Sequence, residues 1–406
     1  MLKNMKLLLP AVATLTLLAA CNPPKPTEPT EPTDPATVAP AAPVAGQSLD
    51  LMKIGETAQT TQATVQAMTD PASADFDADL ANILKLMSAA GPAAQSLLQP
   101  LDALSNPVLR TLGFSKPGTL SAQALTPATT YDQKLPTGTW TVTMSGGVKT
   151  GTQTSLQPTD GYVVDDQVAG LKLTIEWKVS GAQTVWVERK DAYNTHRQEL
   201  PTNMRVTVTG GSKTLASVAL TMKPGACLSI TGPEALTVNG WVGRETNPPL
   251  SMNLAYGWTD SAVTLKGSGQ YLTKTRKATT DFDVTVDATT TGRCTPANMS
   301  IVLKGLKATA SAVLPGQRLD AAVYASNVKN LEFSNTALSV SNPFAQVSGQ
   351  LSASLKYNTH SVLTAFGELA NGNANPLPGD QVKVQFVQNG QLVSTNLEAL
   401  VMQNMR

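Results

Sequence analysis

From Thr137 to the end of the chain, apolar residues recur at every second position in many short segments, and this pattern limits the fold more than any other feature. In the clearest segment, 171–179, apolar residues alternate with lysine, threonine and glutamate. Because successive side chains of a strand point to opposite faces, this pattern predicts half-buried strands. Comparable runs occupy 140–144, 206–209, 215–222, 252–258, 282–286, 300–306, 337–341, 348–357 and 382–388.

Glycine-containing segments separate these runs and predict turns. They are Gly146-Gly147, Gly210-Gly211, Lys266-Gly267-Ser268-Gly269 and Asn389-Gly390. The last of these is typical of a type I′ hairpin. No helical spacing intervenes, so we do not expect crossover units with a parallel sheet. The pattern predicts a mainly β fold for 129–406, built as a large curved antiparallel meander (a half-barrel or a sandwich) that packs with a few helices.

Residues 48–128 form a helical N-terminal segment in this interpretation. Asp70 and Pro71 resemble an N-cap followed by proline at the first helical position. Apolar residues then follow at positions 76, 80, 83, 84 and 87, which is one face of a helix. A second, shorter helix is expected around 97–101. We expect this apolar stripe to pack on the sheet.

Residues 1–20 have the features of a secretory signal peptide, with Lys3 and Lys6 preceding a short apolar stretch. This stretch is shorter than the roughly 20 apolar residues of a membrane-spanning helix. It ends in Leu18-Ala19-Ala20-Cys21, which resembles the lipobox of bacterial lipoproteins. The resemblance implies that Cys21 is acylated, with palmitate among the attached chains, and anchors an exported protein to a membrane of the cell envelope. Asn22 follows the cysteine, and in that family this favours the outer membrane over the inner membrane, within an envelope that includes a periplasm.

Residues 21–47 read as a tether that is rich in proline and threonine. The part from Asn22 to Gln47 holds eight prolines. Proline fixes φ and removes a backbone donor, so an extended polyproline II conformation is favoured over a packed element. The sequence is therefore divided into a signal peptide (1–20), a tether (21–47), a helical segment (48–128) and a β domain (129–406).

The charge and the titratable residues exclude several function classes. Lys and Arg number 30 against 29 Asp and Glu, so we expect no nucleic-acid partner. His196 and His360 lie in polar stretches without a nucleophile or metal motif. Asp281, Asp283 and Asp287 share one face of a strand, where they suit either a solvated surface or a Ca²⁺ site. We expect no enzyme, no catalytic residues, no bound metal and no cofactor.

Two tryptophans are candidate ligand contacts. Trp186 shares a strand face with Thr184 and Glu188, and Trp241 has the polar neighbours Asn239 and Arg244. Each tryptophan is therefore expected either on an outer surface or partly buried under a loop. The expected function is that of a non-enzymatic binding or scaffold module for an envelope protein or a wall polymer. The alternative is a carrier of an apolar ligand or lipid in a cavity of the curved sheet.

With Cys21 acylated, Cys227 and Cys294 remain in the exported part and are predicted to form a disulfide. The alternative is a pair of reactive free thiols. A bridge over this span contributes roughly 4 kcal/mol of stability in the chain-entropy treatment. Mass spectrometry without reductant is expected to find both thiols oxidised, and two free thiols per chain would contradict the bridge.

Overall fold

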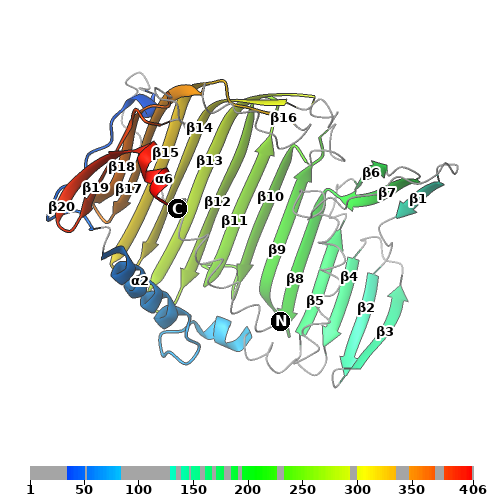
Figure 1. Ribbon diagram of the computed structural model, residues 1–406. Coiled ribbons are helices and arrows are strands. Elements are labelled where there is room, and N and C mark those ends of the chain that lie inside the picture. Colours follow the sequence, from blue (N-terminus) through cyan, green and yellow to red (C-terminus); the bar gives the residue numbers. More distant parts are fainter. Residues whose placement is uncertain are drawn as a thin grey trace, which may run out of the picture. The chain divides into compact units, whose positions relative to one another are not determined.

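The computed structural model divides the chain into two compact units, which are described separately (Figure 1). Unit 1 comprises Met1–Phe76 and Trp258–Arg406, and unit 2 comprises Asp77–Gly257. The prediction of a mainly β chain, built as a curved antiparallel meander with few helices, is confirmed. The structure describes residues 34–50, 53–83, 129–133, 139–145, 148–155, 161–166, 171–177, 184–190, 194–225, 233–292, 300–334, 347–370 and 379–404.

Unit 1 contains a sheet in which strands that follow each other along the chain mostly pair with each other. Its strands are β12 (Ala262–Leu272), β13 (Lys277–Thr291), β14 (Ser300–Leu314), β15 (Gln317–Lys329), β16 (Glu332–Ser334), β17 (Ser348–Tyr357), β18 (His360–Glu368), β19 (Val382–Gln388) and β20 (Gln391–Asn396). All of their pairings are antiparallel, and the short β16 lies against β14. The helical elements of this unit are η1 (Pro35–Thr37), α2 (Ile54–Thr69) and α6 (Leu397–Asn404).

The best-buried core of unit 1 lies at the β18–β19 end of this sheet. Val382 and Val384 are almost completely buried there, beside Phe386. Leu397 and Leu400 of α6 pack against this cluster. The C-terminal helix therefore covers the apolar face of the last strands. A sheet with one apolar face needs such a cover to bury it.

Two of the predicted turns in unit 1 have opposite outcomes. Asn389 and Gly390 both have positive φ (52° and 74°) and join β19 to β20, so the predicted hairpin is confirmed. The turn predicted at Lys266–Gly269 is wrong, because these residues lie inside β12. Gly267 is directly opposite Phe282 of β13. A glycine opposite a large aromatic residue leaves room for the ring, so glycine here serves strand pairing and not chain reversal.

Unit 2 contains two sheets. The larger has the order β3 (Val148–Ser155), β2 (Thr139–Ser145), β4 (Gly161–Asp166), β5 (Leu171–Trp177), β8 (Asn203–Gly210), β9 (Lys213–Lys223), β10 (Ala235–Val242) and β11 (Leu250–Trp258). The smaller has the order β1 (Thr129–Gln133), β7 (Asn194–Pro201) and β6 (Thr184–Lys190). Two pairings, β2–β4 and β1–β7, are parallel, which the sequence pattern did not predict. The turn predicted at Gly210-Gly211 is confirmed as the β8–β9 connection.

The helix predicted to start at Asp70-Pro71 starts later in the chain, at residue 78. α2 occupies Ile54–Thr69, and Asp70 is its C-cap, so the helix start predicted at Asp70-Pro71 is wrong. Turns follow, and the chain is helical again over 78–83. Asp77 caps this helix, because its Oδ1 accepts hydrogen bonds from the backbone N–H groups of Asp79 and Leu80. The stripe residues Phe76, Leu80 and Ile83 are buried, as predicted.

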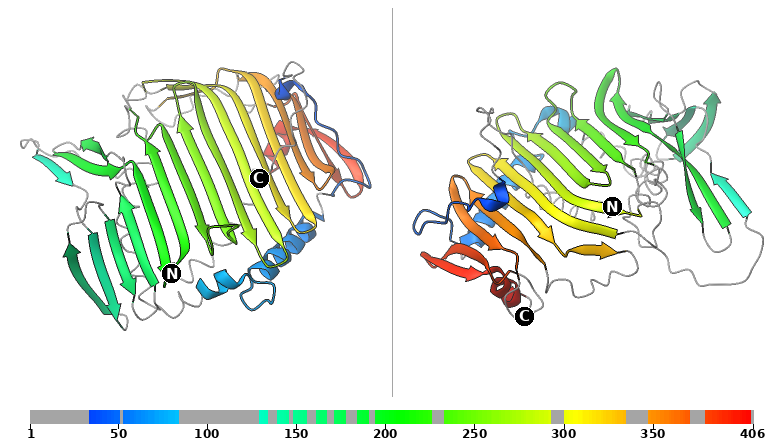
Figure 2. Two further views of the ribbon diagram at one scale, coloured as in Figure 1. Left: turned by 180° about the vertical axis from the view of Figure 1, so that it is seen from behind. Right: turned by 90° about the horizontal axis from the view of Figure 1, so that it is seen from above.

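Residues 34–76, here called the strap, run along unit 1 and bind successive strands and turns (Figures 1 and 2). Backbone carbonyls of Val38 and Ala41 accept hydrogen bonds from Ser352 of β17 and Ser361 of β18. Further along, Asp50 Oδ2 accepts the N–H of Gly390 in the β19–β20 turn, at 2.6 Å. The strap thus fixes strands that are more than 300 residues away in sequence.

The second half of the strap crosses toward β12. Thr61 of α2 bonds Gln317 at the start of β15, and the Tyr271 hydroxyl of β12 donates to the Met68 carbonyl. The strap then ends at the β12–β13 turn, where Asp75 binds Thr273 and Thr275. Thr273 Oγ1 donates to Asp75 Oδ2 at 2.7 Å, and the Thr275 N–H and Oγ1 donate to Oδ1 at 2.9 and 2.8 Å.

Replacement of Asp75 by Asn is expected to lower the stability of unit 1 in a pH-dependent way. The hydrogen bonds from Thr273 and Thr275 hold the pKa of the Asp75 carboxyl below its usual value of 3.8. Because the folded pKa is lowered, the stabilisation is complete above the unfolded-state pKa and is lost as pH falls through the folded value. Thermal unfolding followed by circular dichroism should show Asp75→Asn melting below the wild type at neutral pH, with the two converging in acid.

A matched control for this experiment is Thr273→Val, which removes one of the donors to the carboxylate. Its effect should be smaller when Asp75 is already Asn, since the two residues share one hydrogen-bond network. Equal pH dependence of the wild type and Asp75→Asn would show that the carboxylate does not hold the turn.

Candidate apolar binding face

Alternate residues of β8, β9, β10 and β11 place apolar side chains on one face of the larger sheet of unit 2. Met204 of β8 lies opposite Leu220 of β9, and Val206 lies opposite Val218. The register continues across β10 and β11. This set, called here the apolar face, comprises Met204, Val206, Val208, Ala216, Val218, Leu220, Met222, Leu236, Val238, Gly240, Val242, Leu250, Met252, Leu254 and Tyr256.

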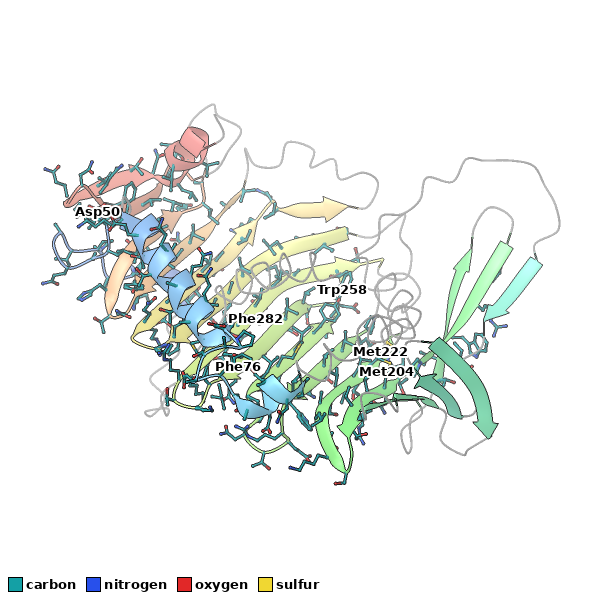
Figure 3. The ribbon with its side chains drawn as sticks, turned by 90° about the horizontal axis from the view of Figure 1, so that it is seen from below. Asp50, Phe76, Met204, Met222, Trp258 and Phe282 are labelled. Carbon is teal, nitrogen blue, oxygen red and sulfur yellow. The ribbon has the colours of Figure 1, made fainter. Side chains whose placement is uncertain are left out.

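One end of the apolar face is covered by the smaller sheet. Met222 and Leu236 lie side by side on β9 and β10 and are buried, with 9% and 6% of their surface exposed. Val185 of β6 packs against this pair. Figure 3 labels Met204 and Met222 on their neighbouring strands. This end therefore has the two layers that an amphipathic sheet requires.

The other end of the apolar face is exposed. Val218, Leu250 and Met252 have 38%, 41% and 49% of their surface exposed. Val218 and Met252 lie on either side of Gly240 in the register. A Cβ at Gly240 would lie 3.2 Å from Val218 Cγ2 and 3.5 Å from Met252 Cγ, so these two side chains close over the glycine. Exposed apolar side chains that are gathered on one face are typical of a binding surface, unlike isolated ones.

The opposite face of β8–β11 is polar, which makes the apolar face distinct. Across one row, Thr207 lies opposite Ser217, which lies opposite Trp241. Trp241, one of the predicted ligand contacts, is half-buried on this polar face. No charged side chain belongs to the apolar face as defined above, so this set of residues cannot form an ion pair with a charged ligand.

The connection between β10 and β11 is held by an ion-pair cluster at the exposed end of the apolar face. Arg244 Nη1 donates to Asp79 Oδ2 at 2.7 Å and to Asp77 Oδ2 at 3.0 Å. These hydrogen bonds, that of Asp79 first, raise the pKa of Arg244. Gly243 has φ +108°, and a Cβ there would overlap the ring of Pro249, so only glycine fits. The helix at 78–83 is thereby fixed to the loop that precedes Leu250.

Trp186, the other predicted contact, lies on the smaller sheet and points away from the apolar face. Its neighbour Val185 packs on Met222 and Leu236, and successive residues of a strand point to opposite sides. The Arg197 guanidinium lies 4.8 Å from the centre of the Trp186 ring. This is a cation–π contact. Trp186 and Trp241 thus belong to different sheets and do not form one site.

The three aspartates of β13 in unit 1 are not gathered into a metal site. Asp283 Oδ2 accepts from Lys266 Nζ at 3.2 Å and Lys307 Nζ at 3.3 Å. Burial raises the pKa of Asp283, but these two lysines outweigh it, and the pKa lies below its usual value. Burial raises the pKa of Asp281. Within the described ranges, no group of three His, Cys, Asp or Glu residues is placed to hold a metal ion.

His360 is exposed at the first position of β18, after the β17–β18 turn. His196 lies on β7, opposite Arg189 of β6.

Cys21, Cys227 and Cys294 lie outside the described residues, as do the predicted strand at 337–341 and the second helix near 97–101. In the described part of the chain, no helix combines the length and the apolar character needed to cross a membrane.

The exposed residues of the apolar face, Val218, Leu250 and Met252, were not predicted as a site. The sequence pattern assigned Met252 and Leu254 to a half-buried strand, which is correct, but gave no signal that Met252 lacks cover. The exposure of Met252 depends on which elements cover its face of the sheet, and the alternation pattern does not contain that information.

Comparison with known proteins finds that no family model matches the chain, and that no curated protein and no solved structure matches it.

Proposed function

We propose that this chain is an exported bacterial lipoprotein, anchored through Cys21 to the cell envelope, that acts as a non-enzymatic binding module for an apolar ligand. The observation that carries the proposal is the group of exposed apolar residues Val218, Met252 and Leu250 at one end of the apolar face. The lipobox-like residues supply the anchor, and the outer membrane is favoured by Asn22.

The ligand of this site is a lipid acyl chain. The apolar face offers side chains without charge, and burial of apolar surface there contributes about 25 cal/mol per Å². A protein partner is a less suitable ligand, because protein interfaces carry about one hydrogen bond per 100–200 Å². The anchor also places the site next to a lipid bilayer, which is a source of acyl chains. A scaffold for an envelope protein or a wall polymer is the competing function.

Titration with a fluorescent fatty acid tests the ligand class. The full chain with Cys21→Ser is expected to bind it with micromolar or tighter affinity. Met252→Gln should weaken binding about tenfold, equivalent to about 1.4 kcal/mol. Because Met252 is half exposed, this change should leave the unfolding temperature almost unchanged.

Ser251→Gln is the matched control, since Ser251 is the preceding residue of β11 and faces the polar side, opposite Trp241. It should bind the fatty acid like the wild type. Equal weakening by both variants, or absence of binding by the wild type, would contradict the proposed site. Retention of peptidoglycan or of an envelope protein in pull-downs, without fatty-acid binding, would favour the scaffold.

The anchor has its own test. Cys21→Ser removes the sulfur that is acylated, and the protein is expected to move from the membrane pellet to the soluble fraction. Several acyl chains hold a protein stably, because each buried CH₂ contributes about 0.8 kcal/mol. Thr27→Ser, in the tether, is the control and should remain in the pellet. Full retention of Cys21→Ser in the pellet would rule out the lipid anchor.

A further inference from the structure

The last strand of unit 1, β20, has one edge without a partner in the described part of the chain. β20 pairs with β19, and Gln388 and Gln391 flank the two-residue turn. Residues of an antiparallel pair alternate between those that bond the neighbouring strand and those that point their N–H and C=O outward. In this register Val393 and Thr395 bond β19, so Leu392 and Ser394 direct their backbone groups away from the sheet.

This edge lacks the features with which proteins prevent strand addition. Charged residues, proline, bulges and short length are the usual protection. β20 consists of Gln-Leu-Val-Ser-Thr-Asn, with no charge and no proline. Other edge strands are protected: β16 has three residues and contains Glu332, and β6 contains Glu188, Arg189 and Lys190.

Exposed apolar residues accompany the edge. Leu392 has 47% of its surface exposed, although Val387, directly opposite on β19, is 1% exposed. Val401 of α6, the helix that follows β20 directly, is 36% exposed. The inner side of the same strand is tied to the core, because Val393 packs on the Val384–Phe386 cluster. The edge is thus uncharged, carries the exposed Leu392, and is held to the core through Val393.

We propose that two copies of this chain associate through β20, as an antiparallel pair with its two-fold axis at Ser394. Self-pairing places Leu392 opposite Asn396 of the second copy and Val393 opposite Thr395. The second of these is a β-branched pair, which stabilises a sheet. A strand that pairs with itself sets like residues close together, and charged ones would repel; β20 carries none. This favours a second copy over an unrelated peptide. The surface belongs to unit 1 and does not use the apolar face.

Sedimentation analysis of the full chain with Cys21→Ser, over a series of concentrations, tests this pairing. The wild-type strand should give a reversible monomer–dimer equilibrium. Ser394→Pro removes the outward N–H from both copies and should raise the dissociation constant about tenfold or more. Ser394→Ala keeps the N–H and is the matched control, and it should dimerise like the wild type.

A second variant keeps the test decisive if proline disturbs the hairpin. Leu392→Lys changes an exposed side chain, so folding is retained, and it introduces the charge that protects other edges. It should also raise the dissociation constant about tenfold or more. Circular dichroism melting curves verify folding of each variant. A wild type that remains monomeric at every concentration, or folded variants that all dimerise equally, would overturn the proposal.

Discussion

A sheet built from strands of period two has one apolar face, and the cover of that face determines the rest of this structure. Along a strand, half of the side chains point to each side, so a sheet cannot bury both faces against itself. In unit 1 the cover is α6, whose Leu397 and Leu400 lie on the β18–β19 cluster. In unit 2 the cover is β6, through Val185. The covered residues of each apolar face form the core, and the residues of unit 2 that are left exposed form the candidate site.

The hydrogen bonds of the strap show how a meander is held in register from outside. Hairpins fix only neighbouring strands, because each turn sets the register of one pair. The strap instead connects β17, β18, the β19–β20 turn and the β12–β13 turn in one continuous run. Carboxylates at Asp50 and Asp75 bind turn N–H groups, which the sheet itself leaves without a partner. The N-terminal segment is therefore part of the fold of unit 1.

Local patterns predicted much of this fold, and they failed where residues distant in sequence decide the outcome. Strands 348–357 and 382–388 were predicted with correct bounds, because alternation and flanking turn residues agree there. Lys266–Gly269 was assigned to a turn, because the cross-strand position of Phe282 cannot be read from a glycine-rich segment. Asp70-Pro71 resembled a helix start, although Asp77 caps the helix. For the site, alternation identified the apolar residues, but their exposure depends on register and on the position of β6.

The route of the strap has a mechanical consequence for a lipid-anchored protein. The described part of unit 1 begins at Asp34, inside the segment 21–47 that was predicted as a tether, and Ala36 of η1 is almost fully buried there. If Cys21 is anchored as proposed, tension from the bilayer acts first on η1 and then on the bonds of Val38 and Ala41 to β17 and β18. Both strands also contribute side chains to the β18–β19 core, so a pull on η1 would be transmitted to strands that this core holds. The apolar face, in unit 2, is not on this load path.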